Sequence, residues 1–246
     1  MGKVKNVLAV LLTVALLIGG SLLPMAATNF QDKTTANVVQ YENIEALQLR
    51  LEEEALSMTY PEKMFLMMHG MGVEITDEKT KIKESEIMEA AYAALAPYMD
   101  LFLGAPFDND YMECYPVMVY DESDPSRYAC YWHVVMSLDM SMKDSVSVIL
   151  DDETGKALAV EMIDPELRIE AEYLQELQYA LAATYIGTLG MEPVAEWPVA
   201  MEPTEKYDGT ENSVAATGYV FIDEVRGVEL NVQIGVRTDG FYIYLG

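Results

Sequence analysis

Two periodic patterns of hydrophobic residues divide the chain into helical and extended segments. Apolar residues at three- and four-residue spacing predict an amphipathic helix over residues 44–58 and a short helix that opens at Pro61 and ends at Gly70. A further helix is predicted from about Glu84, and Pro97 is expected to stop or kink it. The apolar faces of the two longer helices are Ile44, Leu47, Leu51, Ala55 and Met58, and Ile87, Ala91 and Leu95.

The period then changes to two, which is typical of half-buried strands. In "CYWHVVMSL" the even-numbered residues from Cys130 to Leu138 are expected to point one way and the odd-numbered ones the other. The runs 146–150 and 158–162 keep this parity, so three strands predict an antiparallel meander packed against a helix. Another strand is predicted within 111–120, where Pro116 favours an edge or a bulge.

Two of these strands flank the acidic stretch "DDETG", residues 151–155. A calcium loop takes several oxygen ligands at alternating positions over about a dozen residues, and this stretch offers four positions between strands that must pair. Asp and Thr also suit a turn, with Gly155 at a positive φ. The stretch is therefore predicted to be a hairpin turn and no metal site.

The second half repeats the plan. Asp164 followed by Pro165 predicts a helix start, and Gly190 its end. Strands are predicted in "AEWPVAM", "TGYVFIDEV", "VELNVQIGV" and "RTDGFYIYL", the last with an Asp239-Gly240 hairpin. The predicted helical stripe is Leu174, Leu177, Leu181 and Tyr185. The expected fold class is α+β, with two helix-plus-meander units at 43–162 and 163–246.

The N-terminus carries a long uncharged segment. Residues 7–27 reach the length of about 20 mostly apolar residues that spans a bilayer. Lys3 and Lys5 place the stub 1–6 in the cytoplasm, and residues 28–42 form a tether. The expected location is the cell membrane of a bacterium, as a single-pass protein with its bulk outside. The alternative is a signal peptide, cleaved to secrete the protein, although Pro24 and Met25 fit a cleavage site poorly.

The formal net charge is −26. Residues 1–28 hold two lysines and no acid, so the exported part carries 13 basic and 41 acidic residues, a charge of −28. Such a surface repels phosphate backbones, which argues against nucleic-acid binding. It favours a basic peptide or cations as partner, or serves solubility alone.

No catalytic, cofactor-binding or metal-ligating residues are predicted. Nucleophile-elbow, zinc-helix and glycine-rich phosphate motifs are absent from the sequence. Cys130 and His133 fall on opposite faces of one strand, and His69 lies in a methionine cluster typical of core packing. Cys114 and Cys130 could form a disulfide outside the cell, or both could stay reduced.

The order of elements resembles a known family. The helix "IKESEIMEAAYAAL", the strand "YWHVVMSL" and the strand and turn "VSVILDDETGKALAV" are similar to the PepSY-type module, a helix-on-meander plan shared by cystatin-like folds. The resemblance covers about residues 82–162, and 164–246 by layout alone; about 25 residues, 104–129, intervene between helix and aromatic strand. It implies a non-enzymatic extracytoplasmic module that inhibits, senses or scaffolds.

The leading hypothesis is therefore binding of an unidentified protein or peptide outside the membrane. Edge strands or the final hairpin, with Phe241, Tyr242 and Tyr244, could bind by strand addition, or these could be ordinary β-formers. The alternatives are a small-ligand receptor with a concave sheet pocket walled by Trp132 and Trp197, and a hydrolase using carboxylates or Cys114.

Overall fold

The computed structural model describes residues 58–102, 111–137, 144–164, 166–199, 204–205, 211–212, 214–223 and 227–246. The predicted membrane segment 7–27, the tether 28–42 and the helix predicted before Met58 lie outside these residues. Within the described ranges, no helix combines the length and apolarity needed to cross a bilayer.

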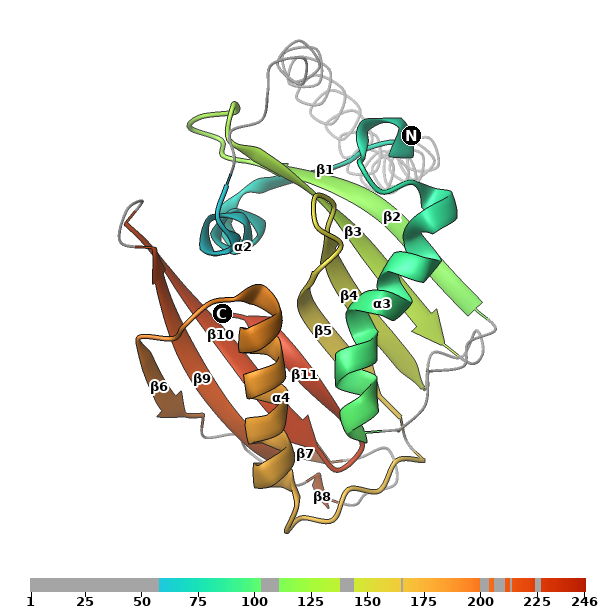
Figure 1. The fold of residues 1–246 in the computed structure, drawn as a ribbon, viewed down its shortest axis with the longest axis vertical. Helices are drawn as coiled ribbons and strands as arrows, with labels where there is room; N and C mark the ends of the chain where they lie inside the picture. Colours follow the sequence, from blue (N-terminus) through green and yellow to red (C-terminus); the bar gives the residue numbers. More distant parts are fainter. Residues whose placement is uncertain are drawn as a thin grey trace, which may run out of the picture. The chain divides into compact units, whose positions relative to one another are not determined.

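The fold class is α+β, as predicted, with an antiparallel sheet and helices packed on it (Figure 1). The helices are α2 (Tyr60–His69), the 3-10 turn η1 (Asp77–Lys79), α3 (Glu84–Phe102) and α4 (Leu174–Leu189). The strands are β1 (Met71–Glu74), β2 (Tyr111–Tyr120), β3 (Tyr128–Ser137), β4 (Ser145–Asp151), β5 (Ala157–Ile163), β6 (Ala195–Pro198), β7 (Thr204–Glu205), β8 (Glu211–Asn212), β9 (Val214–Asp223), β10 (Val228–Arg237) and β11 (Gly240–Leu245).

Strands from both halves of the chain form one nine-stranded sheet, in the order β1-β2-β3-β4-β5-β11-β10-β9-β6. The seam between the halves is the pairing of β5 with β11, from Gly240 opposite Ile163 to Ile243 opposite Val160. The two predicted meanders are thus joined edge to edge rather than forming separate sheets. β11 pairs with β10 on one side and with β5 on the other. The prediction that a partner could add a strand to the final hairpin is therefore wrong.

α3 and α4 lie beside each other on one side of this sheet (Figure 1). α3 contacts β4 and β5, and α4 contacts β9 and β10. The predicted alternation is confirmed beneath them: Val146, Val148 and Leu150 of β4 are fully buried, as are Val232 and Ile234 of β10. The core therefore lies between the sheet and these two helices.

α2 lies where the sheet opens. β11 ends at Leu245, opposite Val232, whereas β10 continues to Val228 and β5 begins at Ala157. Beyond the end of β11 the two halves separate, and α2 contacts β2 and β3 on one side of this wedge and β9 and β10 on the other (Figure 1). Its Met64 is fully buried, so α2 completes the core at this end.

The helix stop considered at Pro97 and the helix start predicted at Asp164 are both wrong. α3 continues through Pro97 to Phe102, although an interior proline costs about 3 kcal/mol. The turn after it buries Tyr98 and stacks Phe102 on Phe241 at 4.5 Å, and this packing offsets the cost. Likewise, Asp164 begins a turn and no helix, because Ile169 N donates to Thr238 O and holds the chain against the β10–β11 hairpin; α4 begins at Leu174.

Several other predictions are confirmed. α2 ends before Gly70, and α4 ends at Gly190 in the left-handed conformation, with φ 68°. Pro116 belongs to β2 and faces the position just after the edge strand β1 ends. Its missing N–H therefore removes no hydrogen bond from the β1–β2 ladder, and its carbonyl accepts from Ile75 N at 3.1 Å. The β10–β11 hairpin exists, with Thr238 and Asp239 as its loop and Gly240 as the first residue of β11.

Candidate functional site

The acidic stretch 151–155 is the hairpin turn that the sequence predicts. Gly155 has φ 69° and its N–H donates to Asp151 O at 2.8 Å, closing the turn between β4 and β5. The turn nevertheless does more than reverse the chain, because its two aspartates are 1% and 4% exposed.

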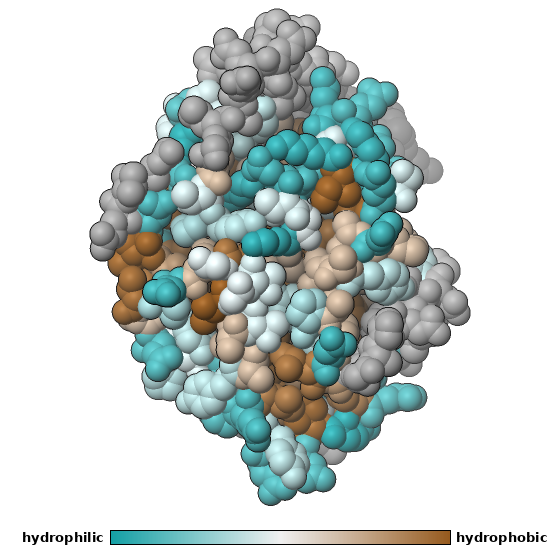
Figure 2. All heavy atoms as spheres, in the orientation of Figure 1, coloured by the Kyte–Doolittle hydropathy of each residue, from teal (hydrophilic) through white to brown (hydrophobic). Residues whose placement is uncertain are grey.

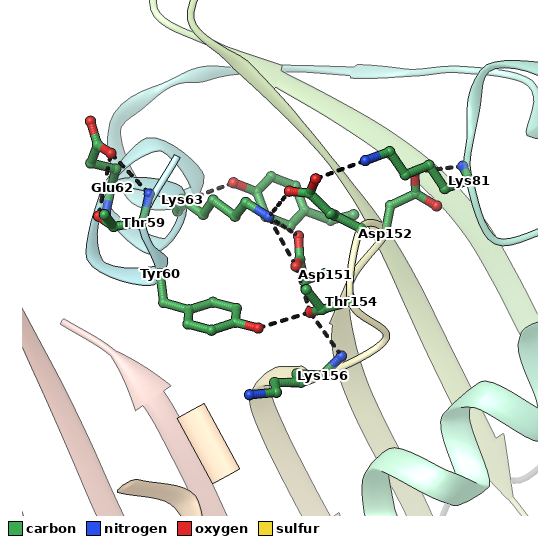
Figure 3. Close-up of polar contacts among 11 residues, drawn as sticks. Thr59, Tyr60, Glu62, Lys63, Lys81, Asp151, Asp152, Thr154 and Lys156 are labelled. Atoms are coloured by element: carbon green, nitrogen blue, oxygen red, sulfur yellow. Dashed lines mark hydrogen bonds and ion pairs between the residues drawn. The ribbon is translucent and has the colours of Figure 1, made fainter. Parts of the chain in front are cut away.

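Asp152 is a buried carboxylate that orders the segment before α3 (Figure 3). Its oxygens accept from Lys81 N at 2.7 Å, Ile82 N at 3.0 Å and Trp132 Nε1 at 3.2 Å. The sequence held a signal for this burial: Asp152 continues the even-numbered side of β4, which is the side that packs on α3. We predicted a turn here from the residue types and missed the burial.

Asp151 points to the other side and pairs with Lys63 of α2 (Figure 3). Lys63 Nζ donates to Asp151 Oδ1 at 2.8 Å, Asp151 Oδ2 at 3.0 Å and Glu153 Oε2 at 2.8 Å. Burial alone would lower the pKa of Lys63, but its bonds to Asp151 and Glu153 outweigh this and raise the pKa. Lys63 is thus a protonated ion-pair partner and not a nucleophile.

Further bonds tie α2 to elements of both halves. Tyr131 Oη of β3 donates to Lys63 O at 2.6 Å, and Thr59 Oγ1 donates to Asp223 Oδ2, at the end of β9, at 2.7 Å. Glu62, which also closes the capping box with Thr59, meets Arg127 Nη2 at 3.3 Å. We call Thr59, Glu62, Lys63, Asp151, Asp152 and Glu153 the anchor cluster. The charged groups of the anchor cluster are hydrogen-bonded to donors and acceptors of the protein itself. We therefore interpret the cluster as a group that stabilises the fold and not as a reactive site.

The anchor cluster makes stability depend on pH at acidic values. Bonds to Lys63 and Lys81 lower the pKa of Glu153 to about 2. A carboxylate with a lowered folded-state pKa stabilises the fold above its unfolded pKa, and this contribution disappears as the pH falls from about 4.5 towards 2. We expect the urea midpoint of unfolding to fall as the pH is lowered across this window. The midpoint of Glu153→Gln should fall less steeply with pH, because the variant has no carboxylate to protonate at this position. Equal slopes for both proteins would contradict this role of Glu153.

The two cysteines are free in the structure. Cys114 lies opposite Val134 and Cys130 opposite Met118, so four residue positions separate them along the β2–β3 ladder. That is about 13 Å by the rise of a strand, beyond the roughly 7 Å between Cα atoms that a disulfide spans. Of the two alternatives that the sequence left open, the structure therefore has the reduced cysteines and no Cys114–Cys130 bridge. Burial raises the pKa of Cys114, with Glu84 adding to the shift, and raises that of Cys130 to about 12.

His133 has partners other than Cys130. Its Nδ1 lies 2.5 Å from Tyr115 Oη and its Nε2 lies 3.1 Å from Ser147 Oγ. Burial lowers the pKa of His133. A serine–histidine pair acts on an acyl group when backbone donors stabilise the oxyanion. Here the two residues lie on neighbouring paired strands, whose amides are taken up by the sheet. The geometry favours a cross-strand polar contact. Among the described residues, no group of three or more His, Cys, Asp or Glu could hold a metal ion.

The side of the sheet opposite α3 and α4 carries a second group of candidate residues. Register places them on one side of the sheet, because residues opposite each other on neighbouring strands share a face. We call this side the open face and define it by Tyr115, His133, Ser147, Ile149, Ala159, Glu161, Tyr244, Gln233 and Trp197. These side chains are half-buried or exposed in the part of the chain that the structure describes.

Two exposed aromatic rings mark the open face. Trp197 of β6 is 36% exposed, and its indole lies on Gly218, where an added Cβ would meet the ring at 2.3 Å. Tyr244 of β11 is 39% exposed and stacks on Tyr242 at 4.7 Å. Gly218 and Gln233 lie between the two rings.

The other tryptophan has a different place. Trp132 is 1% exposed beneath α3, so it belongs to the core and does not wall a pocket on the concave side. Figure 2 views the molecule from the side of α3 and α4, where hydrophobic residues reach the surface in a few separate patches. The open face is the better candidate for binding.

Together, the core under two helices and the open face define an α+β protein built on one antiparallel sheet. No family model, curated protein or solved structure matches the chain. The resemblance to the PepSY-type module therefore stays a prediction from the sequence.

Proposed function

We propose that this chain is a non-enzymatic binding protein that holds a segment of a protein or peptide on the open face of its sheet. One observation carries the proposal: α3 and α4 cover one side of the sheet, while the other side presents Trp197 and Tyr244, at 36% and 39% exposure, in one row of paired residues. Exposed aromatic rings are typical centres of protein interfaces. With its N-terminal segment in the membrane, the chain would present this face outside the cell.

The sheet edges are weaker candidates for binding. The outermost strands of the nine-stranded sheet, β1 and β6, are each four residues long, and β6 ends in Pro198. Short, proline-marked edges are typical of strands that resist pairing with another chain. Contact through side chains of the open face is therefore favoured over strand addition.

The proposal predicts which substitutions abolish binding. The full-length protein in detergent would be panned against a displayed library of random short peptides. For the peptides selected, Trp197→Ala and Tyr244→Ala should each weaken binding about tenfold or more, because each removes an exposed ring from the face. Intrinsic fluorescence offers a direct readout, because Trp197 lies on the face and Trp132 in the core.

The matched control is Tyr179→Ala, which removes an aromatic ring that is 57% exposed on α4, on the other side of the sheet. It should leave binding unchanged. The proposal would be overturned if the library yielded no binding peptide. It would also be overturned if Tyr179→Ala lost binding while Trp197→Ala and Tyr244→Ala bound the peptides as the unchanged protein does.

A further inference from the structure

A hollow lies on the open face beside α2. It has a volume of about 510 Å³ and lies where α2 fills the wedge between β5 and β10. Its walls are Met67 and Met68 of α2, Ile149 of β4, Ala159 of β5, and Tyr244 and Leu245 of β11, with Gln233 of β10 supplying an amide.

The lining determines what the hollow can hold. Aliphatic and thioether groups from four elements form most of it, and methionines adapt their shape to the group they contact. Gln233 offers an amide beside these groups, and burial together with the nearby carboxylate of Glu161 raises the pKa of Tyr244, which therefore stays a neutral phenol. Such a lining suits an apolar side chain whose backbone stays outside, where Gln233 can bond to it.

Charge determines the residues around that side chain. The chain carries 41 acidic and 15 basic residues, and Glu113 and Glu161 lie on the same side of the sheet as the hollow. Arg237, a basic residue of this region, is already paired with Glu161 at 3.2 Å and with Asp239 at 3.7 Å. A segment that crosses this face meets negative potential, which attracts lysine and arginine.

We propose that the hollow receives a leucine, methionine or phenylalanine side chain from a basic segment of the partner, whose lysines and arginines face the acidic surface around it. This inference rests on the proposed function and names the chemistry of the segment bound. The side chain in the hollow supplies the anchor of the complex, and the basic residues supply attraction that salt weakens.

The test uses labelled synthetic peptides and the full-length protein in nonionic detergent, with binding read by fluorescence anisotropy. The first peptide alternates lysine and threonine around one central leucine. A second has alanine in place of the leucine, and a third has glutamate in place of every lysine. We expect the alanine peptide to bind about tenfold more weakly than the leucine peptide. The glutamate peptide should not bind, and added salt should weaken the leucine peptide.

A variant that fills the hollow gives a second measurement. Ala159→Leu adds a side chain within the hollow and should weaken the leucine peptide about tenfold, while leaving the weak binding of the alanine peptide unchanged. Ala93→Leu is the matched control, because Ala93 lines a different open hollow, between α3 and the β4–β5 turn. It should bind the leucine peptide as the unchanged protein does.

Three outcomes would overturn the inference. Equal binding of the leucine and alanine peptides, both lost in Trp197→Ala, would remove the anchor and keep the open face as the site. Binding of library peptides without binding of any lysine peptide would remove the basic segment, again without affecting the proposed function. Binding of the lysine peptides that survives Trp197→Ala, Tyr244→Ala and Ala159→Leu alike would remove both proposals.

Discussion

Replacing Lys63 with methionine is expected to lower the free energy of unfolding by about 3–5 kcal/mol, the cost typical of leaving one member of a buried ion pair without its partner. The residue is 5% exposed, and Asp151, which accepts two of its hydrogen bonds, is 1% exposed. Methionine keeps much of the side-chain volume of lysine, so the loss reports the charge and its hydrogen bonds. The measurement is urea unfolding at neutral pH, followed by circular dichroism.

Two further variants separate this effect from a general loss of charge. Lys81 also pairs with Glu153, at 2.8 Å, but its side chain is 66% exposed, so Lys81→Met should cost less than about 1 kcal/mol. Asp151→Asn combined with Lys63→Met removes the buried charge that Lys63→Met leaves unpaired, and should be more stable than Lys63→Met alone. A cost for Lys63→Met no larger than that for Lys81→Met would contradict the role of the anchor cluster.

Local pattern was sufficient to predict the strands and their buried sides. Alternation in β4, β5 and β10 identified the core residues, because side chains of a strand point to opposite faces in turn. In β3 it was only partly right: Trp132, Val134 and Met136 are buried as predicted, but Tyr131 and Ser137 on the other side are buried too, and Tyr131 is covered by α2, to which it is bonded. Turn residues at 151–155 and 238–240 located two hairpins. Helix boundaries were less accurate at Pro97 and Asp164, where packing against the sheet decided the outcome.

Contacts between segments far apart in the sequence could not be predicted from the local pattern of hydrophobic residues. The β5–β11 seam joins strands about 80 residues apart, and the wedge that α2 fills arises because β11 is shorter than its neighbours. Lys63 meets Asp151 across 88 residues of sequence. Of the open face, Trp197 and Tyr244 were candidates from the sequence, but Gln233 and Ala159 join them through register alone. Alternation predicts which way a side chain points, and strand order decides what lies beside it.

Replacing Gly240 with alanine is the second substitution with a large expected effect, about 2–5 kcal/mol of destabilisation. Gly240 has φ 153°, a conformation that other residues rarely adopt, and an added Cβ would lie 2.0 Å from Met162 O and 2.9 Å from Met162 C. Both contacts are with backbone atoms, so no side-chain rotation relieves them. Because Gly240 is opposite Ile163 at the end of the β5–β11 seam, the strain falls where the two halves of the sheet join.

Gly187 provides the matched control for this substitution. It lies on α4, and apart from the local backbone of this helix and its chain neighbours no heavy atom lies within 4 Å of the position of an added Cβ. Gly187→Ala should therefore stabilise the fold by about 0.5–1 kcal/mol, through the better helix propensity of alanine. Thermal unfolding of both variants against the unchanged protein gives the comparison, with the two shifts expected in opposite directions. If Gly240→Ala unfolds at the same temperature as the unchanged protein, the backbone of β11 does not approach β5 as closely as described, and the continuous nine-stranded sheet would have to be revised at its seam.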